Sequence, residues 1–356
     1  MWLLKINMRI TKLIIGLLLF LMLLAGCPEG PPFAAKLAVG HNPNEIITRS
    51  TPYLYYITVT NDNVVPVVVN NTPPKQKINV GEQPIGIALW QGGARLYVVN
   101  NAGLSISVIA LSNDTFGGGN SVIDSITNTS FHNMGDAVVT ADGRYLYVAT
   151  DTNAISVIST TTDKVVTTFT DPSFNYPAHL VADAFNRYVF VSESRGNAVS
   201  VISTTTNTVI KTIGVGVSPN GMTETTDGNW LFVVNSGSNS ISVIDVNSLT
   251  VARTVTDTSF NNPQRIALTP ECAYGFVSEL NSGNISVISQ NALITGSGRA
   301  VIEDIYSGAQ PYDLTVLYIS PTQSAYVTVV LKGENAIDFI DYRFINEIFN
   351  ACFQKV

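Results

Sequence analysis

Residues 96–110 read LYVVNNAGLSISVIA, and they contain the unit from which the rest of the chain is built. LYVVN (96–100) and ISVIA (106–110) are rich in β-branched and aromatic residues, which favour strands. The segment between them contains Asn and Gly, the residues of a tight hairpin turn. The two runs are therefore expected to be antiparallel neighbours.

An aromatic residue at the centre of the first strand recurs along the whole chain. It stands at Tyr55, Tyr97, Tyr147, Phe190, Phe232, Phe276 and Tyr326, with spacings of 42, 50, 43, 42, 44 and 50 residues. A second strand follows each one, starting at Val64, Ile106, Ile155, Val199, Ile241, Ile285 and Ile337. Seven aromatic strands thus have seven partners, which identifies an internal repeat.

Two further strands complete each repeat. A proline-led run precedes the aromatic strand, at Pro43, Pro84, Pro177, Pro219, Pro263 and Pro311, with Met134 in the third repeat. A Thr-rich turn and an outer strand come last, most clearly in TTTDKVVTTF (160–169) and TTTNTVIKTI (204–213). Four antiparallel strands in a repeat of this length are the geometry of a propeller blade. The sequence predicts an all-β fold, a seven-bladed β-propeller with four antiparallel strands per blade.

The repeat resembles the YVTN-type propeller repeat, whose name-giving strand is seen here as YVVN, YVAT and FVVN before an N-x-[IV]-S-V-I sequence. The resemblance covers roughly residues 36–345. It implies a propeller of the cell surface or periplasm. It implies no particular activity, because such proteins have varied or unassigned roles.

The N-terminus has the features of an export signal. Lys5, Arg9 and Lys12 precede an apolar run of 13 residues, Leu13 to Ala25, which is short for a membrane span. The following LLAGC sequence resembles a bacterial lipobox, and this resemblance implies that Cys27 is lipidated and anchors the chain to a membrane. We expect a lipoprotein signal peptide at 1–26, a lipidated linker at 27–35 and a single propeller at 36–356. The expected location is the cell envelope, at the outer membrane or cell surface if the cell is Gram-negative.

Two structural questions stay open in the sequence. The ring of blades must close, and either FAAKLAVGHNP (33–43) or FINEIFNACF (344–353) supplies the outer strand of the last blade. Cys272 and Cys352 form a disulfide in an oxidising compartment or remain buried thiols.

Charge excludes one class of partner. Without residues 1–26 the chain has 16 basic and 26 acidic residues, a net charge of −10. Such a surface repels nucleic-acid phosphates, so we expect no nucleic-acid binding. No phosphate-binding loop, G-x-S-x-G or Cys-x-x-Cys sequence is present.

The proline also predicts where a site would form. Two residues after it, or after Met134, stand Glu45, Gly86, Asp136, His179, Gly221, Arg265 and Asp313. The same register in every blade places these residues in a ring at one mouth of the central channel. The acids and His179 suit a divalent cation or acid-base chemistry, and Arg265 suits an anion. Alternatively, neighbouring loops and water satisfy these charges and the ring has no ligand.

A loop motif, T-[ND]-x-S-F, recurs before three innermost strands and contains Phe131, Phe174 and Phe260. With Tyr176 and Tyr312 these rings would form an aromatic rim for a sugar, a peptide or a partner protein. Alternatively, each phenylalanine folds under its own loop and pins it.

Two functions follow from these features. The first is a monomeric, membrane-anchored binding or scaffold propeller without a cofactor, which presents one face to a protein, peptide or glycan. The alternative is a metal-assisted, lactonase-like hydrolase with its site at the channel mouth. The sequence favours the first, on the basis of the lipid anchor, the complete ring and the rim loops.

Overall fold

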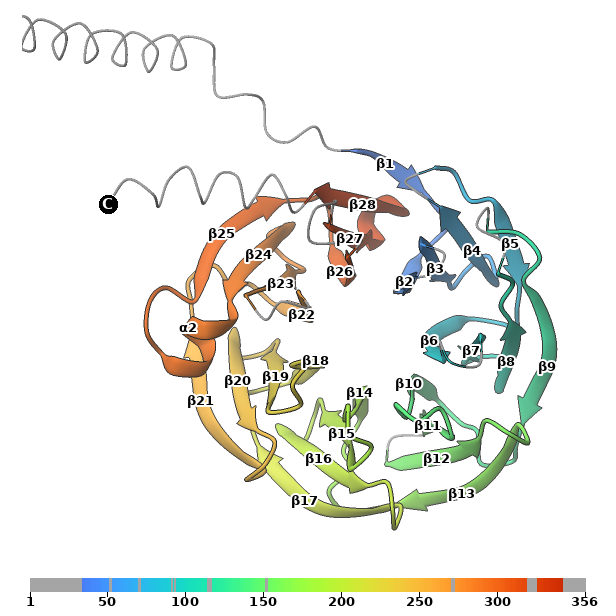
Figure 1. Cartoon of the computed structure of the whole chain (residues 1–356), viewed down its shortest axis with the longest axis horizontal. Coiled ribbons are helices and arrows are strands. Elements are labelled where there is room, and N and C mark those ends of the chain that lie inside the picture. The colour runs from blue at the N-terminus through green and yellow to red at the C-terminus, as the bar shows by residue number, and fades with distance from the viewer. Residues whose placement is uncertain are drawn as a thin grey trace, which may run out of the picture.

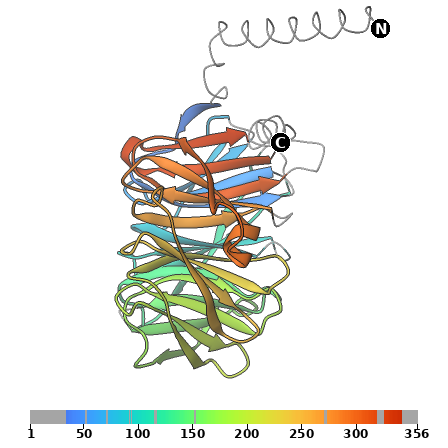
Figure 2. The same cartoon turned by 90° about the vertical axis from the view of Figure 1, so that its left-hand side faces the viewer.

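The computed structural model describes residues 34–341, apart from 51–52, 70–71, 91, 93, 114–116, 151–152, 270–272 and 319–324. The described chain forms seven sheets of four antiparallel strands each. Figure 1 shows the sheets arranged as a ring around a central axis, and Figure 2 shows the same ring edge-on as a disc. The protein is a seven-bladed β-propeller, as its sequence predicts.

The strands follow one another from the axis outward in six of the blades. Blade 1 contains β2 (Pro43–Ser50), β3 (Tyr53–Val59), β4 (Val64–Val69) and β5 (Gln76–Asn79). Blade 2 contains β6 (Pro84–Trp90), β7 (Arg95–Asn100), β8 (Ser105–Ala110) and β9 (Ser121–Thr127). Blade 3 contains β10 (Met134–Val139), β11 (Tyr145–Thr150), β12 (Ala154–Ser159) and β13 (Lys164–Thr170). Blade 4 contains β14 (Pro177–Ala182), β15 (Tyr188–Glu193), β16 (Ala198–Ser203) and β17 (Thr208–Gly214).

Blades 5 and 6 repeat this order. Blade 5 contains β18 (Pro219–Glu224), β19 (Trp230–Asn235), β20 (Ser240–Asp245) and β21 (Thr250–Thr256). Blade 6 contains β22 (Pro263–Leu268), β23 (Tyr274–Glu279), β24 (Asn284–Ser289) and β25 (Val301–Tyr306). Blade 6 also holds one short helix between its outer strands, α2 (Gln290–Thr295), which Ser289 caps at its start and Gly296 ends in a left-handed conformation.

Blade 7 combines both ends of the described chain. It contains β26 (Pro311–Tyr318), β27 (Ala325–Leu331) and β28 (Ala336–Asp341), with the 3₁₀ turn η2 (Lys332–Glu334) between the last two. Its outer strand is β1 (Ala34–Ala38), which pairs antiparallel with β28. Figure 1 shows the blue N-terminal strand beside the red strands of the last blade. The ring therefore closes through the N-terminal segment, and β1 covers the edge that β28 would otherwise expose.

The core consists of seven apolar clusters, one between each pair of adjacent blades. The repeated aromatic residue supplies much of this core, because six of its seven positions are buried with 1% exposure or less. The blades are thus held together by side chains that cross from one sheet to the next. This packing fixes the inner strands around the axis and brings equivalent positions together.

Candidate functional site at the channel mouth

Each innermost strand has a β-bulge within its first residues. The pairing with the second strand shifts between the landmark residue and the position two or three residues later in all seven blades. A bulge re-aims the side chains next to it. Here it turns the second residue after the proline toward the axis. We call the face of the disc where the innermost strands begin the mouth face.

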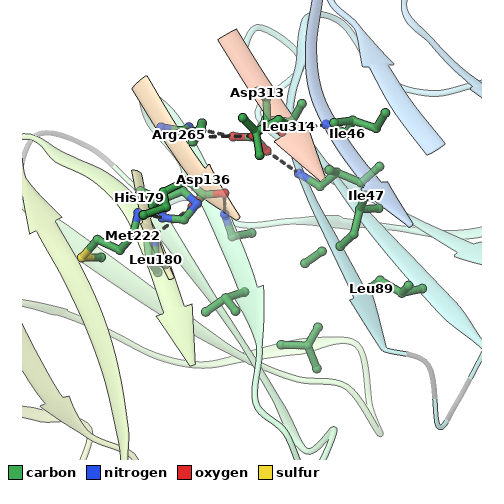
Figure 3. A pocket seen from close by; sticks show the side chains of 17 residues that line it. Ile46, Ile47, Leu89, Asp136, His179, Leu180, Met222, Arg265, Asp313 and Leu314 are labelled. Carbon is green, nitrogen blue, oxygen red and sulfur yellow. Dashed lines mark hydrogen bonds and ion pairs between the residues drawn. The ribbon is translucent and has the colours of Figure 1, made fainter. Parts of the chain in front are cut away.

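The structure brings the five predicted ring residues together. Glu45, Asp136, His179, Arg265 and Asp313 all line one cavity of about 240 Å³ on the axis. The four charged residues of this set are buried, with 5 to 9% exposure. Figure 3 shows Arg265 and Asp313 pointing toward each other, with Asp136 beside His179. Apolar residues such as Ile47, Leu89 and Val138 form the deeper wall.

Four ring side chains also join neighbouring blades. Each accepts a hydrogen bond from the backbone N–H that lies three residues after the proline of the next blade. These bonds run from Ile46 to Asp313 (2.8 Å), from Ile87 to Glu45 (3.0 Å), from Leu180 to Asp136 (2.7 Å) and from Met222 to Nδ1 of His179 (3.2 Å). The ring is therefore a belt between blades as well as a channel lining.

The glycine position of blade 2 supports this interpretation. Blade 2 has Gly86 in the register position, which offers no acceptor to blade 3. The N–H of Ala137 bonds instead to Oδ1 of Asp136 on its own strand, at 2.8 Å. A buried N–H needs an acceptor, so the carboxylate of Asp136 serves two blades at once.

Arg265 is the central cation of the ring. Its guanidinium lies 3.3 Å from Oε1 of Glu45 and 3.8 Å from Oδ1 of Asp313, and it donates a hydrogen bond to the side-chain oxygen of Asn220. Tyr312 places its ring 5.4 Å from the guanidinium carbon. Sequence reasoning missed Asn220, which is the residue directly after a landmark proline.

Burial has the largest effect on the pKa values of the three acids of the ring. It raises the pKa of Glu45 well above its usual value, and the neighbouring Asp136 adds to the effect. It raises the pKa of Asp136 to about 6, and it also raises that of Asp313. Three carboxyls compete for one guanidinium in a poorly hydrated site, so the neutral acid is favoured.

His179 is neutral in this environment. Burial, followed by the charge of Arg265, lowers its pKa well below the ordinary value. Nδ1 accepts the bond from Met222, which leaves the proton on Nε2, 3.7 Å from Oδ2 of Asp136. This distance is too long for a hydrogen bond. His179 therefore works as a neutral acceptor between blades 4 and 5.

The acids of the ring do not converge on one point in the way that a metal requires. Within the described ranges, no group of three His, Cys, Asp or Glu side chains is placed to hold a metal ion. Each carboxylate commits at least one oxygen to a backbone N–H. Nothing in the described structure favours the hydrolase alternative.

The predicted aromatic rim is wrong for its three phenylalanines. Phe131, Phe174 and Phe260 are 0, 4 and 3% exposed and pack between blades. Each phenylalanine is the last residue of a tight turn, in which its own N–H donates a hydrogen bond to the carbonyl three residues earlier. The turn directs the aromatic ring inward, because burying its apolar surface between the blades stabilises the fold more than leaving it in water. These rings pin their loops.

Two buried glutamates, each at the end of the second strand of its blade, hold two of these three loops. Sequence reasoning missed both. Glu193 accepts the N–H of Asn175 at 2.6 Å, and Glu279 accepts that of Asn261 at 2.7 Å. Both are fully buried. Burial raises the pKa of Glu193 to about 7 and that of Glu279 to about 8. The signal was the final Glu of VFVSE and GFVSE, where LYVVN, LYVAT and LFVVN have Asn or Thr.

Tyr176 is the predicted rim residue that does reach the surface. It is 39% exposed, and the guanidinium carbon of Arg195 lies 3.4 Å from its ring centre. Its backbone is left-handed, with a φ of 61°. Left-handed residues directly precede the landmark position in every blade, and they are Asn42, Gln83, Asn133, Tyr176, Ser218, Asn262 and Gln310. Asn tolerates this conformation, whereas a bulky residue there is unusual.

Tyr312, the other predicted tyrosine, is half-buried at the mouth. The Nζ of Lys332 lies 3.2 Å from its ring centre, on η2 of the same blade. Burial, with repulsion from Arg265, lowers the pKa of Lys332 to about 8. Tyr312 thus lies close to two cations.

Several predictions lie outside the described residues. They are the signal peptide, the lipidation of Cys27, the pairing of Cys272 with Cys352, and residues 344–353. Among the described residues, no helix is long and apolar enough to span a membrane.

The comparisons support the fold. The chain is similar to a chain in a solved structure titled Kuenenia stuttgartiensis Hydrazine Synthase, with a TM-score of 0.72 and 17% sequence identity. The match covers 88% of this chain and 98% of that chain. At this identity the similarity shows the shared fold alone. No family model and no curated protein matches the chain.

Proposed function

We propose that this protein is an extracytoplasmic, membrane-anchored binding propeller that presents its mouth face to a protein, peptide or glycan partner. The fold is compatible with a binding or scaffold role. The anchor rests on the lipobox-like sequence that ends at Cys27. The choice of face rests on Tyr176.

Tyr176 carries the proposal because a large aromatic residue occupies a left-handed backbone position, where such a residue is unfavourable. A left-handed conformation costs an ordinary L-residue about 1–2 kcal/mol. Three blades avoid most of this penalty with Asn at positions 42, 133 and 262, and the other three accept it with smaller residues, Gln83, Ser218 and Gln310. Blade 4 accepts the strain and exposes 39% of a large aromatic side chain beside the channel mouth. Strain of this kind concentrates at functional sites.

The surface around Tyr176 is continuous with the next blade. Arg195 and Asn197 belong to the hairpin between β15 and β16, and both are exposed. The side-chain oxygen of Asn197 accepts the N–H of Ser218 at 3.0 Å, which joins this hairpin to the loop before β18. Val217 of that loop is 49% exposed. An aromatic ring, a guanidinium, an amide and an apolar side chain thus form one patch, a composition typical of binding surfaces.

The test is crosslinking on intact cells with Tyr176→Asn. This substitution removes the ring and suits the left-handed backbone. We expect the crosslinked partner to be lost while the chain stays folded and at the membrane. The matched control is Phe185→Asn, which removes an aromatic residue that is 61% exposed on the opposite face. Retention of the partner by Tyr176→Asn, or its loss only in Phe185→Asn, would show that the mouth face is the wrong one.

The anchor is tested separately. Cys27→Ser should release the folded chain from the membrane fraction and remove the lipid. A Cys27→Ser chain that remains with the membrane without lipid would contradict the anchoring part of the proposal.

A further inference from the structure

Two cations of the mouth face are held on tyrosine rings and lack an acidic partner. The guanidinium of Arg195 lies on Tyr176, and the ammonium of Lys332 lies on Tyr312. Among the described residues, no carboxylate lies within 4.0 Å of either cation. Contact with an aromatic face orients a cation without neutralising its charge.

Three other basic side chains near this face contact acidic groups. Lys36 lies 2.8 Å from Glu334, the ring of His41 lies 2.9 Å from Asp62, and Arg265 lies between two acids of the channel ring. The chain outside the signal peptide also has ten more acidic than basic residues. Other described cations, Arg144 and Lys211 among them, also have no carboxylate within 4.0 Å, so Arg195 and Lys332 differ from them in being held by tyrosine rings at the channel mouth.

The two cation–tyrosine pairs lie on opposite sides of the channel mouth. Tyr176 directly precedes β14 of blade 4, and Tyr312 is the second residue of β26 in blade 7. Two blades separate them on one side of the ring and three on the other, as Figure 1 shows for β14 and β26. Both tyrosines neighbour the bulged start of an innermost strand. A ligand that contacts both cations must therefore cross the mouth.

We propose that the partner of this face contributes a short acidic peptide segment, which lies across the channel mouth with carboxylates at Arg195 and Lys332. This inference rests on the proposed function and specifies its partner. The guanidinium fork suits a carboxylate, and the ammonium supplies a second fixed charge. Tyr176 and Val217 provide apolar contact beside Arg195.

Charge also limits the length of the segment. Glu45, Asp136 and Asp313 lie in the channel below the mouth. A carboxylate that entered this buried, acid-lined cavity would lose its hydration beside groups that already favour the neutral form, so the segment lies over the mouth and not in it. The net negative charge of the chain disfavours a long polyanion for the same reason. A few carboxylates at two fixed positions satisfy both limits.

The test measures the binding of labelled peptides to the intact chain, solubilised in detergent, by fluorescence anisotropy. The probes are glutamate-glycine, glutamine-glycine and lysine-glycine peptides of equal length. We expect the acidic peptide to bind most tightly and to weaken as salt is raised. Equal affinity for the acidic and neutral peptides overturns the inference.

Substitutions assign the binding to the two cations. Arg195→Gln and Lys332→Gln should each weaken binding of the acidic peptide on the order of threefold, as expected for ion pairs near the surface, and together on the order of tenfold. The matched control is Arg144→Gln, which removes an exposed guanidinium that lies 5.8 Å from the ring of Tyr145 on the opposite face. Unchanged binding in the double variant, or an equal loss in Arg144→Gln, overturns the inference. A thermal melt of each variant shows whether it is folded.

The two proposals can fail separately. If the acidic peptide does not bind but Tyr176→Asn still abolishes crosslinking on cells, the mouth face is the binding surface and the acidic partner is wrong. If crosslinking also survives Tyr176→Asn, both proposals are wrong.

Discussion

Asp313 of the last blade accepts the backbone N–H of Ile46 of the first blade at 2.8 Å, across 267 residues of sequence. The bond lies at the axis, where the two ends of the ring meet. At the periphery of the same junction, β1 pairs with β28. The ring is thus closed twice, by a strand on the outside and by a carboxylate on the inside.

The inner closure predicts a selective loss of stability. Asp313→Ala leaves the buried N–H of Ile46 without its acceptor and removes an acid from Arg265. We expect about 1–3 kcal/mol lower free energy of unfolding, measured by urea titration. Asp313→Asn keeps an acceptor and should lose less. Equal losses in the two variants would contradict this role.

The outer closure predicts the effect of a truncation. A chain that begins at Val39 lacks β1 and exposes the edge of β28. We expect a lower thermal midpoint and concentration-dependent association, measured by light scattering. The control begins at Ala34 and keeps the strand. If the shorter chain is as stable and monomeric as the control, another segment closes the ring.

Arg265→Met should make stability depend more steeply on pH. The guanidinium lowers the pKa values of Glu45, Asp136 and Asp313, which burial raises. Carboxyls with raised pKa values stabilise the folded state below their ordinary values near 4, and this contribution is lost as pH rises through the folded values. Without Arg265 the folded values rise further. We expect a loss of about 3–5 kcal/mol at pH 7 and a smaller loss near pH 4, by urea titration at both.

Replacing a loop glutamate with glutamine should stabilise the protein in alkali relative to the parent. The folded pKa of Glu279 is about 8, above the ordinary value of 4.5. Its contribution is therefore present below about pH 4.5 and is lost as pH rises to 8, at up to about 1.4 kcal/mol per pH unit. Glu279→Gln mimics the neutral acid, so it should be more stable than the parent at pH 9 and similar at pH 4.

Hydrogen exchange localises this effect. Residues 256–262 should exchange faster in the parent chain as pH rises, after correction for intrinsic rates, and the Gln variant should not show this change. The loop at 127–133 is an internal control, because its blade has Thr150 in place of the glutamate. A matching change in that loop would contradict the assignment.

Tyr176 predicts a difference between two substitutions that both remove its ring. Asn tolerates the left-handed backbone, whereas Ala does not. Tyr176→Asn should therefore be more stable than Tyr176→Ala by about 1 kcal/mol, measured by urea titration. The same pair at Phe185 should not favour Asn, because that position is not left-handed. Equal stability of the two Tyr176 variants would remove the strain on which the binding face is argued.

The sequence by itself determined the blade count, the strand order and the membership of the channel ring. These depend on local signals that repeat: the buried aromatic residue, the hairpin turn and the proline that starts each innermost strand. Because every blade uses the same register, the five ring residues converge once the ring exists. The sequence also offered FAAKLAVGHNP (33–43) as a candidate outer strand, but an equally apolar segment near the C-terminus left the choice open.

Only the tertiary structure decided what the ring residues do and which aromatic rings reach the surface. Each of four ring side chains accepts a hydrogen bond from a backbone N–H of the next blade; they are Glu45, Asp136, His179 and Asp313. The spacing of residues in the sequence does not reveal such bonds between sheets. Phe131, Phe174 and Phe260 share a loop motif that fits either an exposed rim or a buried pin. Their fate depends on the space between adjacent blades, because a ring that can enter an apolar gap gains more there than at the surface.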